Sequence, residues 1–504
     1  MPQLSRIRKL CLLFGVSLLS FTGFLDSTIV STALPDIQSS LHMPVSQLQW
    51  IMNAFFLGIS AFMASMGRVG DLYGRRKVFY IGTLIFTLAS IGAGFSTSSG
   101  FLILCRAFQG ITTAITIPVG ITLIQVAHKK EEIAKAMSVF GSVTGAGLAL
   151  GPVLGGALVT GFGWSAVFLV NVPFVLIGFL LCLFGVKESR SDTKMTLDYL
   201  GIIFLTLTIG SLVFGMVEAN SAGWSSEMVV ISFVITVVSL IILVFVERVV
   251  AFPIMAGYLF RNRVFVPSMI FSFVGGSAMS IVLFIDPLYL HIVLEKSNFL
   301  TGIILFIISI IVVLTAYIVG HVYKLMGAKS IMIIASLAYL IMSVLHMILG
   351  INVSYAIIVP TFILMGVGWG VVNTVPGTAL GENIHGDHLG VAIGALFSFF
   401  NIGAAVLLAI SVVIFHSMAL ISLSKQFIQH RFVLTSVDSK FLKQFIGQPD
   451  QLHQFASKLD INHVDATIFL KNAFVSGMHS MYLPIVILAI ISLLGLVFLM
   501  RKTT

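Results

Sequence analysis

Two charged side chains lie inside long apolar stretches of this chain, where charges are rare. Asp26 lies in the stretch near 10–34, and Arg106 lies in the stretch near 101–124. If these stretches cross a membrane, each charge costs roughly 2.5–3.5 kcal/mol at the bilayer centre on insertion scales, so it needs a partner or an aqueous cavity. Asp26 could then bind a proton or a cationic ligand, and Arg106 could bind and release an acidic group. The structural alternatives are a hydrogen-bonding residue near the outer interface for Asp26 and a static buried pair for Arg106.

A further acid, Asp286, precedes Pro287 in another apolar stretch and is followed by Tyr289 and His291. It could take part in proton coupling or contact a substrate. The alternative is an interfacial position, where the charge costs little.

Signals for other chemistry are weak. His385, Asp387 and His388 cluster without a supporting ligand set, so we predict no metal site. The sequence contains no Walker motif and no convincing nucleophile elbow. We therefore expect neither a cofactor nor an enzyme activity.

One apolar stretch carries glycines at a spacing of four residues. Gly147, Gly151 and Gly155 share one helical face, against which another helix could pack closely, and Gly156 adjoins it. Pro152 removes a helix donor and favours a kink. This face could be ordinary close packing or a moving interface.

A glycine-containing basic segment, residues 67–77, is predicted to form a tight loop between two spans. Gly67 and Gly74 allow sharp backbone geometry. Asp71 could cap a helix end or pair with Arg75 or Arg76. The alternative role is topology alone, since the bases would anchor this loop on the inner side.

Composition defines the class of protein that must position these residues. Of the 504 residues, 58% are hydrophobic and 9% are charged, whereas soluble domains carry about 25% charged residues. This composition excludes a soluble enzyme and a disordered chain, and it predicts an all-α polytopic membrane protein. Fourteen stretches are long enough to span: 10–34, 48–66, 78–96, 101–124, 134–160, 165–186, 198–217, 227–246, 264–290, 299–320, 328–350, 353–380, 389–416 and 474–500.

The positive charges set the predicted orientation. The net charge is +9, but the basic residues lie between apolar spans, which points to membrane topology and not to nucleic-acid binding. With the N-terminus inside, most of the 28 lysines and arginines fall on the cytoplasmic side. Both termini are then cytoplasmic, which requires an even number of spans.

An internal repeat predicts the domain organisation. Residues 67–76 and 320–329 share glycine, valine, leucine, glycine and a base at matching offsets, and both follow the second span of a six-span block. We therefore predict a six-helix half at 1–190, two inserted helices at 191–260 and a second six-helix half at 261–504. Duplicated halves around a midplane site are typical of transporters. Residues 417–473 are predicted as a long outer loop that covers the mouth, binds a partner or packs on itself.

These motifs resemble the major facilitator superfamily, and its fourteen-span drug:proton antiporter branch in particular. Residues 67–77 resemble the family's inner loop between spans two and three, and Arg106, Gln109 and Gly110 match its fourth-span motif. Residues 147–156 match the fifth-span antiporter motif, and 25–35 resemble the first-span motif of the branch. Trp164, followed by Phe168, Asn171 and Pro173, looks like a further branch motif.

The resemblance implies proton-driven export of amphipathic or toxic small molecules by alternating access through the cell (inner) membrane. It implies that Asp26 takes part in proton or substrate coupling and that Arg106 supports proton transfer. It also implies that the fifth-span glycines form a sliding interface and that Asp71 steadies the outward-open state. With Asp286, Asp26 and Gln109 are the candidate substrate-binding residues.

The expected partners are a small-molecule substrate, protons and the lipid bilayer, and a periplasmic adaptor protein is one further candidate. Two other functions remain open. A proton-coupled importer of the same fold is disfavoured by the fifth-span glycines, and a non-transport membrane sensor is disfavoured by the repeated halves.

Overall fold

The computed structural model describes residues 6–185, 198–250, 253, 257–384, 388–429 and 463–500. Within these ranges all regular elements are helices, as predicted. The N-terminal helices are α1 (Arg6–Ile29), η1 (Val30–Ala33), α2 (Leu34–Ser40), α3 (Val45–Leu48), α4 (Trp50–Tyr73), α5 (Arg75–Gly94), α6 (Ser99–Ala127), α7 (Lys130–Phe162), α8 (Ala166–Leu169) and α9 (Asn171–Gly185). The remaining helices are α10 (Tyr199–Ala222), α11 (Glu227–Val249), η2 (Gly257–Arg261), α12 (Phe265–Leu288), η3 (Tyr289–Val293), α13 (Asn298–His346), α14 (Tyr355–Asn383), α15 (His388–Gln429) and α18 (His463–Phe498).

Among the described residues, twelve helices are long and apolar enough to cross a membrane, against the fourteen spans predicted. Two helices account for the difference. The 49 residues of α13 contain a non-helical residue, Gly327 at φ 71°, so that α13 comprises two apolar segments on either side of a kink. A left-handed φ of this kind favours glycine. Helix α4 is 24 residues long, and the part of it that counts as apolar among the described residues, Trp50–Met63, is too short to be included among the twelve. The number fourteen stays a prediction.

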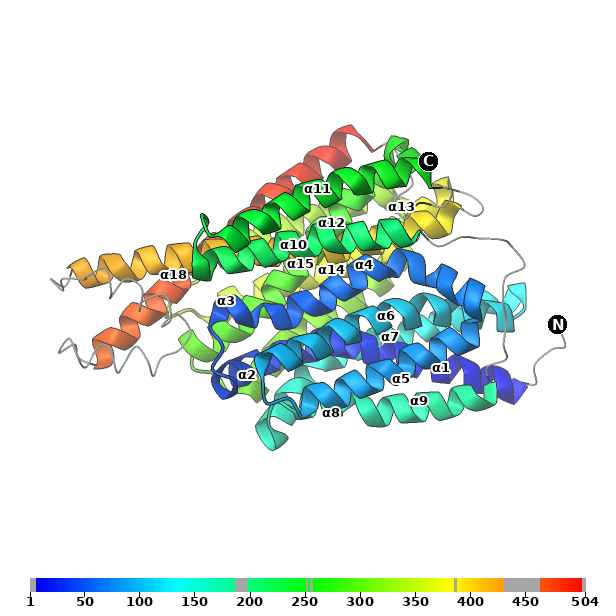
Figure 1. The fold of residues 1–504 in the computed structure, drawn as a ribbon, viewed down its shortest axis with the longest axis horizontal. Helices are drawn as coiled ribbons and strands as arrows, with labels where there is room; N and C mark the ends of the chain where they lie inside the picture. Colours follow the sequence, from blue (N-terminus) through cyan, green and yellow to red (C-terminus); the bar gives the residue numbers. More distant parts are fainter. Residues whose placement is uncertain are drawn as a thin grey trace.

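Successive long helices run in opposite directions, so their ends gather at two ends of the bundle (Figure 1). The basic end contains the start of α1 and the junction of α4 and α5, with the bases Arg8, Lys9, Arg75 and Arg76. There Lys9 Nζ lies 2.5 Å from a carboxylate oxygen of Glu132, which joins the starts of α1 and α7. The far end contains α2 and α3.

The N-terminal helices α1–α9 and the C-terminal helices α12–α18, here the two halves of the bundle, meet chiefly along two helix pairs, α7 with α13 and α4 with α15. Helix α10 packs on both α4 and α15 and so lies across this contact. Helix α11 packs chiefly on α10, where Ser211 and Thr236 hydroxyls are 2.8 Å apart. Elsewhere α11 exposes large apolar side chains such as Ile241 and Phe245, as a lipid-facing helix does.

The segment predicted as a long outer loop begins and ends as helix. Helix α15 continues to Gln429 and α18 starts at His463, so both project beyond the bundle at the far end (Figure 1). The projections contact each other: the rings of Phe427 and Phe469 are 5.8 Å apart, and Gln426 Nε2 donates to Phe469 O at 3.3 Å. The rest of the predicted loop, 430–462, lies outside the described residues.

Residues 67–77 also differ from the predicted loop. Helix α4 continues to Tyr73 and α5 starts at Arg75, so the only break is at Gly74, whose φ of 102° explains the glycine. Gly67 and Asp71 therefore lie in the last turns of α4, and the Asp71 side chain lies outside the described part of the structure.

Candidate functional site

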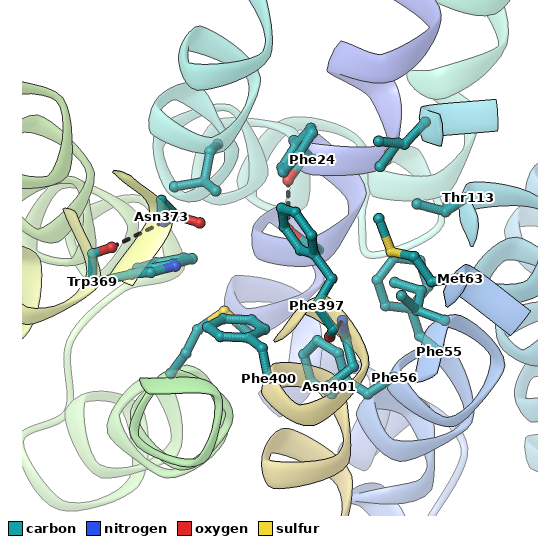
Figure 2. Close-up of a pocket in the computed structure, with 16 residues that line it drawn as sticks. Phe24, Phe55, Phe56, Met63, Thr113, Trp369, Asn373, Phe397, Phe400 and Asn401 are labelled. Atoms are coloured by element: carbon teal, nitrogen blue, oxygen red, sulfur yellow. Dashed lines mark hydrogen bonds between the residues drawn. The ribbon is translucent and has the colours of Figure 1, made fainter. Parts of the chain in front are cut away.

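A cavity lies between the two halves of the bundle, with about 540 Å³ of empty space when the open solvent at its mouth is included. Figure 2 shows its walls, which come from α1, α4, α6 and α7 on one side and from α12, α14 and α15 on the other. Its lining residues are Gly23, Phe24, Ser27, Phe55, Phe56, Ile59, Met63, Thr113, Ile117, Leu148, Met279, Trp369, Asn373, Phe397, Phe400 and Asn401.

Aromatic side chains dominate this lining, and none of the lining residues is charged. Two asparagines supply most of the polarity. Asn373 Nδ2 donates to Trp369 O at 3.0 Å, as the dashed line between these residues in Figure 2 shows, and Asn401 Nδ2 donates to Phe397 O at 2.8 Å. With their amide nitrogens engaged, both asparagines have a carbonyl oxygen that could accept a hydrogen bond from a ligand. The cavity therefore suits a largely apolar, aromatic molecule that carries a donor.

Between the cavity and the far end, the two halves are packed closely. A Cβ placed on Gly156 of α7 would lie 2.6 Å from the Asn298 carbonyl oxygen of α13, so only glycine fits there. Asn298 Nδ2 also donates to Asp36 Oδ1 of α2 at 2.9 Å. A Cβ placed on Gly302 of α13 would lie even closer to the Pro152 carbonyl oxygen of α7. These contacts close the far end.

Toward the basic end, the helix faces that line the cavity continue into open space. Leu148 of α7 is followed in that direction by Gly145 and Gly141, and neither would bring a Cβ within 4 Å of another atom. Asn373 of α14 is followed by Gly377 and Gly381 on the same helical face, with the same result. The cavity is thus closed at the far end and open toward the basic end.

The predicted glycine face serves two different contacts. Gly147, Gly151 and Gly155 pack against α1, where a Cβ on Gly151 would overlap Thr28. Gly156 and Pro152 instead face α13 of the other half. Of the glycines and the proline in this motif, Gly156 and Pro152 are therefore the ones that contact the other half.

Asp26 is completely buried behind the cavity and accepts three hydrogen bonds. Asn171 Nδ2 donates to Oδ1 at 2.8 Å, Gln109 Nε2 donates to Oδ1 at 3.3 Å, and Arg106 forms an ion pair with Oδ2. Every partner is a donor and one is a permanent cation, so the arrangement holds Asp26 as a carboxylate.

Arg106 is equally well enclosed. Its Nη1 also donates to Gln109 Oε1 at 2.8 Å, and its Nε donates to the Ile51 carbonyl oxygen at 3.0 Å. The guanidinium carbon lies 4.3 Å from the centre of the Phe55 ring. Because Phe55 also lines the cavity, it is a direct physical link between this charge pair and a bound molecule.

Removing one member of such a buried pair is strongly destabilising, by about 3–5 kcal/mol, because the other charge is left without a partner. Neutralising Asp26 with a proton would have the same electrostatic effect on Arg106. A protonation change at Asp26 is therefore able to drive rearrangement of the α1–α6 contact.

Asp286 is also buried, in the last turn of α12. Its Oδ1 accepts from the Tyr482 hydroxyl at 2.7 Å, and its Oδ2 lies 3.1 Å from His346 Nε2. His346, which we had no reason from the sequence to place near an acid, thus joins Asp286 and Tyr482 in a second polar cluster.

The structure separates the predicted substrate residues from the cavity wall. Asp26, Gln109 and Asp286 are not among the lining residues, whereas Ser27 and Thr113, close by on the same helices, are. The abundance of phenylalanine and methionine is a weak signal for an apolar pocket, and it does not indicate which of these residues line the cavity, because they also face lipid. Asn171 belongs to a branch motif, but the sequence analysis did not assign it to the Asp26 site. Its position as a polar residue in an apolar span could have indicated a buried polar partner.

Comparisons with known proteins identify the family of this chain. The family model of the Major Facilitator Superfamily matches residues 16–408. Multidrug resistance protein Stp of Mycobacterium tuberculosis (strain CDC 1551 / Oshkosh) is 29% identical over 399 residues, which are 79% of this chain and 74% of that protein. The tetracenomycin C resistance and export protein of Streptomyces glaucescens is 28% identical over 392 residues, which are 76% and 71% of the two chains.

Solved structures share the fold at low sequence identity. A bacterial homolog of the human lysosomal transporter Spinster, in an inward-facing and unoccupied conformation, superposes with a TM-score of 0.65 at 13% identity, covering 99% of this chain and 100% of that one. A POT family transporter in complex with 5-aminolevulinic acid gives 0.60 at 14% identity, covering 90% and 96%.

Proposed function

The chain belongs to the Major Facilitator Superfamily and is a multi-pass membrane transporter, and on that premise we propose that it is a proton-coupled exporter of amphipathic, aromatic small molecules. The observation that carries the proposal is the buried Asp26–Arg106 pair, joined through Phe55 to an uncharged aromatic cavity. Two similar proteins named for resistance, to several drugs and to tetracenomycin C, support the direction of transport.

We propose that the basic end faces the cytoplasm. Loops rich in lysine and arginine stay on that side in most membrane proteins. The protein then lies in the cell (inner) membrane with both termini in the cytoplasm, and the conformation described above is inward-open. Substrate would enter the cavity from the cytoplasm or the inner leaflet.

The uncharged lining supports one class of substrate over another. No carboxylate lines the cavity to balance a permanent positive charge, whereas aromatic rings and two asparagine oxygens are available. The favoured substrates are therefore neutral aromatic molecules, or singly charged cations that rings alone can hold through cation–π contacts. Divalent cations are disfavoured.

Proton coupling is proposed to act through the charge pair. In the outward-open state a proton from outside would neutralise Asp26, and Arg106 would keep its contacts with Gln109, the Ile51 carbonyl and the Phe55 ring. In the inward-open state Asp26 would release that proton and regain Arg106. Moving one charge through 100 mV supplies about 2.3 kcal/mol. This energy supports a concentration ratio of about 40-fold.

Everted membrane vesicles with an acidic interior test the proposal. Addition of a neutral aromatic substrate should release protons from vesicles that contain the wild-type protein, and Asp26→Asn should abolish that release. Glu227→Gln is the matched control, because Glu227 is an exposed acid in the first turn of α11, outside the cavity and the contact between the halves. Proton release that persists in Asp26→Asn would remove Asp26 from the coupling route.

The rival functions predict different outcomes in the same vesicles. An importer would move substrate out of the vesicle lumen together with protons. A sensor would move nothing. A requirement for a periplasmic adaptor would appear as activity only in cells that supply one, and the projecting ends of α15 and α18 are where such a partner would be sought.

A further inference from the structure

Asp286, His346 and Tyr482 meet in the C-terminal half, from α12, α13 and α18. All three residues are at most 1% exposed. The imidazole of His346 stacks on the Tyr482 ring, with ring centres 4.2 Å apart and an angle of 19° between their planes. The proposed coupling at Asp26 assigns no role to this buried acid and its neighbouring histidine.

The hydrogen bonds of His346 fix where its protons must be. Its Nδ1 lies 2.9 Å from the Met342 carbonyl oxygen, which can only accept, so Nδ1 carries a hydrogen. Its Nε2 faces Asp286 Oδ2 at 3.1 Å. If neither atom held a proton, two lone pairs would face each other. The short contact therefore requires one further proton, held between Nε2 and Oδ2.

The other carboxylate oxygen is already used. Asp286 Oδ1 accepts from the Tyr482 hydroxyl at 2.7 Å. In the described part of the chain, neither oxygen of Asp286 meets a lysine or an arginine. This differs from Asp26, whose partner Arg106 cannot lose its proton. The positive partner of Asp286 is a group that titrates near neutral pH when it is not perturbed.

Other titratable groups on the elements packed around α12 have partners of their own. The Tyr289 hydroxyl donates to the Gly350 carbonyl oxygen at 2.7 Å, and His479 Nε2 lies 2.6 Å from the Leu349 carbonyl oxygen. Asp36 of α2 is bonded to Asn298, and His291 Nδ1 lies 3.1 Å from the Lys296 carbonyl oxygen. His416 of α15 is a further buried histidine on a helix that packs on α12.

We propose that Asp286, His346 and Tyr482 form a second proton-binding site, in which one exchangeable proton is shared between His346 Nε2 and Asp286 Oδ2. When the proton leaves, the products are a carboxylate that still accepts from Tyr482 and a neutral imidazole that still donates through Nδ1. The site binds a proton without any permanent cation. It deepens the proposed function, because the carrier then holds protons in both of its halves.

The position of the site on α12 connects it to transport. Asp286 lies in the last turn of α12, two turns beyond Met279, which lines the cavity. Helix α12 contacts α2 and η1, which belong to the other half. Separation of the halves at the far end would remove these contacts and admit water beside Asp286. Proton exchange at this site is therefore tied to opening of the far end.

Nitrogen-15 NMR of histidine-labelled protein in nanodiscs tests the site without any transport. The His346 signals are assigned as those lost in His346→Gln. We expect Nδ1 to stay protonated across the titration, whereas Nε2 loses its proton as the pH rises. In Asp286→Asn the loss should occur at a pH lower by at least about one unit, since an opposite charge at this distance typically changes a titration by one to three units.

A pair of tyrosine variants separates proton sharing from packing. Tyr482→Phe removes the donor to Asp286, makes the carboxylate a stronger proton acceptor and should move the His346 titration to higher pH. Tyr339→Phe is the matched control, because the buried Tyr339 hydroxyl has no hydrogen-bond partner among the described residues. The proposal is overturned if Nε2 stays unprotonated throughout, or if Asp286→Asn leaves the titration unchanged while the spectrum shows a folded protein.

Proton counting in vesicles adds a separate readout. Asp286→Asn should export substrate with about one proton fewer per cycle, whereas Asp26→Asn should export none. If neither the two variants nor the wild-type protein move protons, the proposed function fails. The NMR result on His346 still decides whether the second proton-binding site exists. If Asp286→Asn retains the wild-type proton count, a transport role for the site is contradicted.

Discussion

Gly156 of α7 lies where the two halves touch at the far end, and its replacement by alanine should open that end. The new Cβ would lie 2.6 Å from the Asn298 carbonyl oxygen and 3.1 Å from Phe299 Cα, which are backbone atoms of α13 that cannot turn aside. Overpacking of this kind costs about 1–3 kcal/mol. The clash exists only while the halves are packed at this end, so only the closed state is destabilised. The ratio of closed to open molecules should fall by a factor of about 5 to 150.

Spin labels at Ser40 and Asn352, two exposed far-end positions in opposite halves, would measure the change as a distance distribution. The three native cysteines would first be replaced. Gly156→Ala should add a population at longer distance. Gly161→Ala is the control: it lies on the same helix, has no atom within 4 Å of a new Cβ and gains the same helix propensity of about 1 kcal/mol. Identical distributions for the two variants would refute the role of this contact.

Two further predictions concern the cavity and the surface. Trp369→Ala should raise the KM for aromatic substrates about 2- to 10-fold, from the 0.5–1.5 kcal/mol typical of an aromatic contact, whereas Trp224→Ala outside the cavity should not; equal effects on transport kinetics would contradict the cavity assignment. The pKa of Glu295 is lowered by a hydrogen bond from Lys471 and by the positive charge of Lys471. Above the usual glutamate pKa, this exposed pair should stabilise the fold by less than about 1 kcal/mol. The stabilisation should be lost as the pH falls through the lowered pKa. Thermal unfolding of Glu295→Gln and wild type should therefore converge in acid, below the lowered pKa, and a difference that persists there would be evidence against the pair.

The helical membrane fold was predictable because the bilayer fixes the length of each apolar stretch. The stretches gave the order and direction of the helices, and the comparisons confirm the fold and the family. Helix ends outside the bilayer were not predictable in this way. Residues 417–429 and 463–473 continue α15 and α18 although they are less apolar, since a helix that is paired on one side needs no lipid to persist.

The candidate site was predictable only one residue at a time. Asp26 and Arg106 are conspicuous as charges in apolar spans, but they are 80 positions apart, and their pairing depends on how α1 packs on α6. His346 is a single histidine on an apolar helix, and its partner Asp286 lies 60 positions away. The cavity lining was least accessible, because a phenylalanine facing a substrate and one facing lipid have the same sequence signature.

Exchange of substrate for protons is the central claim, and purified protein in liposomes tests it most directly. A proton gradient, acidic inside and imposed with the membrane potential clamped at zero, would be the only energy source. We predict uphill accumulation of a neutral aromatic substrate in the acidic lumen, carried out by the protein molecules whose outer side faces the lumen. We predict no accumulation with Asp26→Asn. Accumulation that is independent of the gradient, or that needs the gradient in the opposite direction, would contradict antiport.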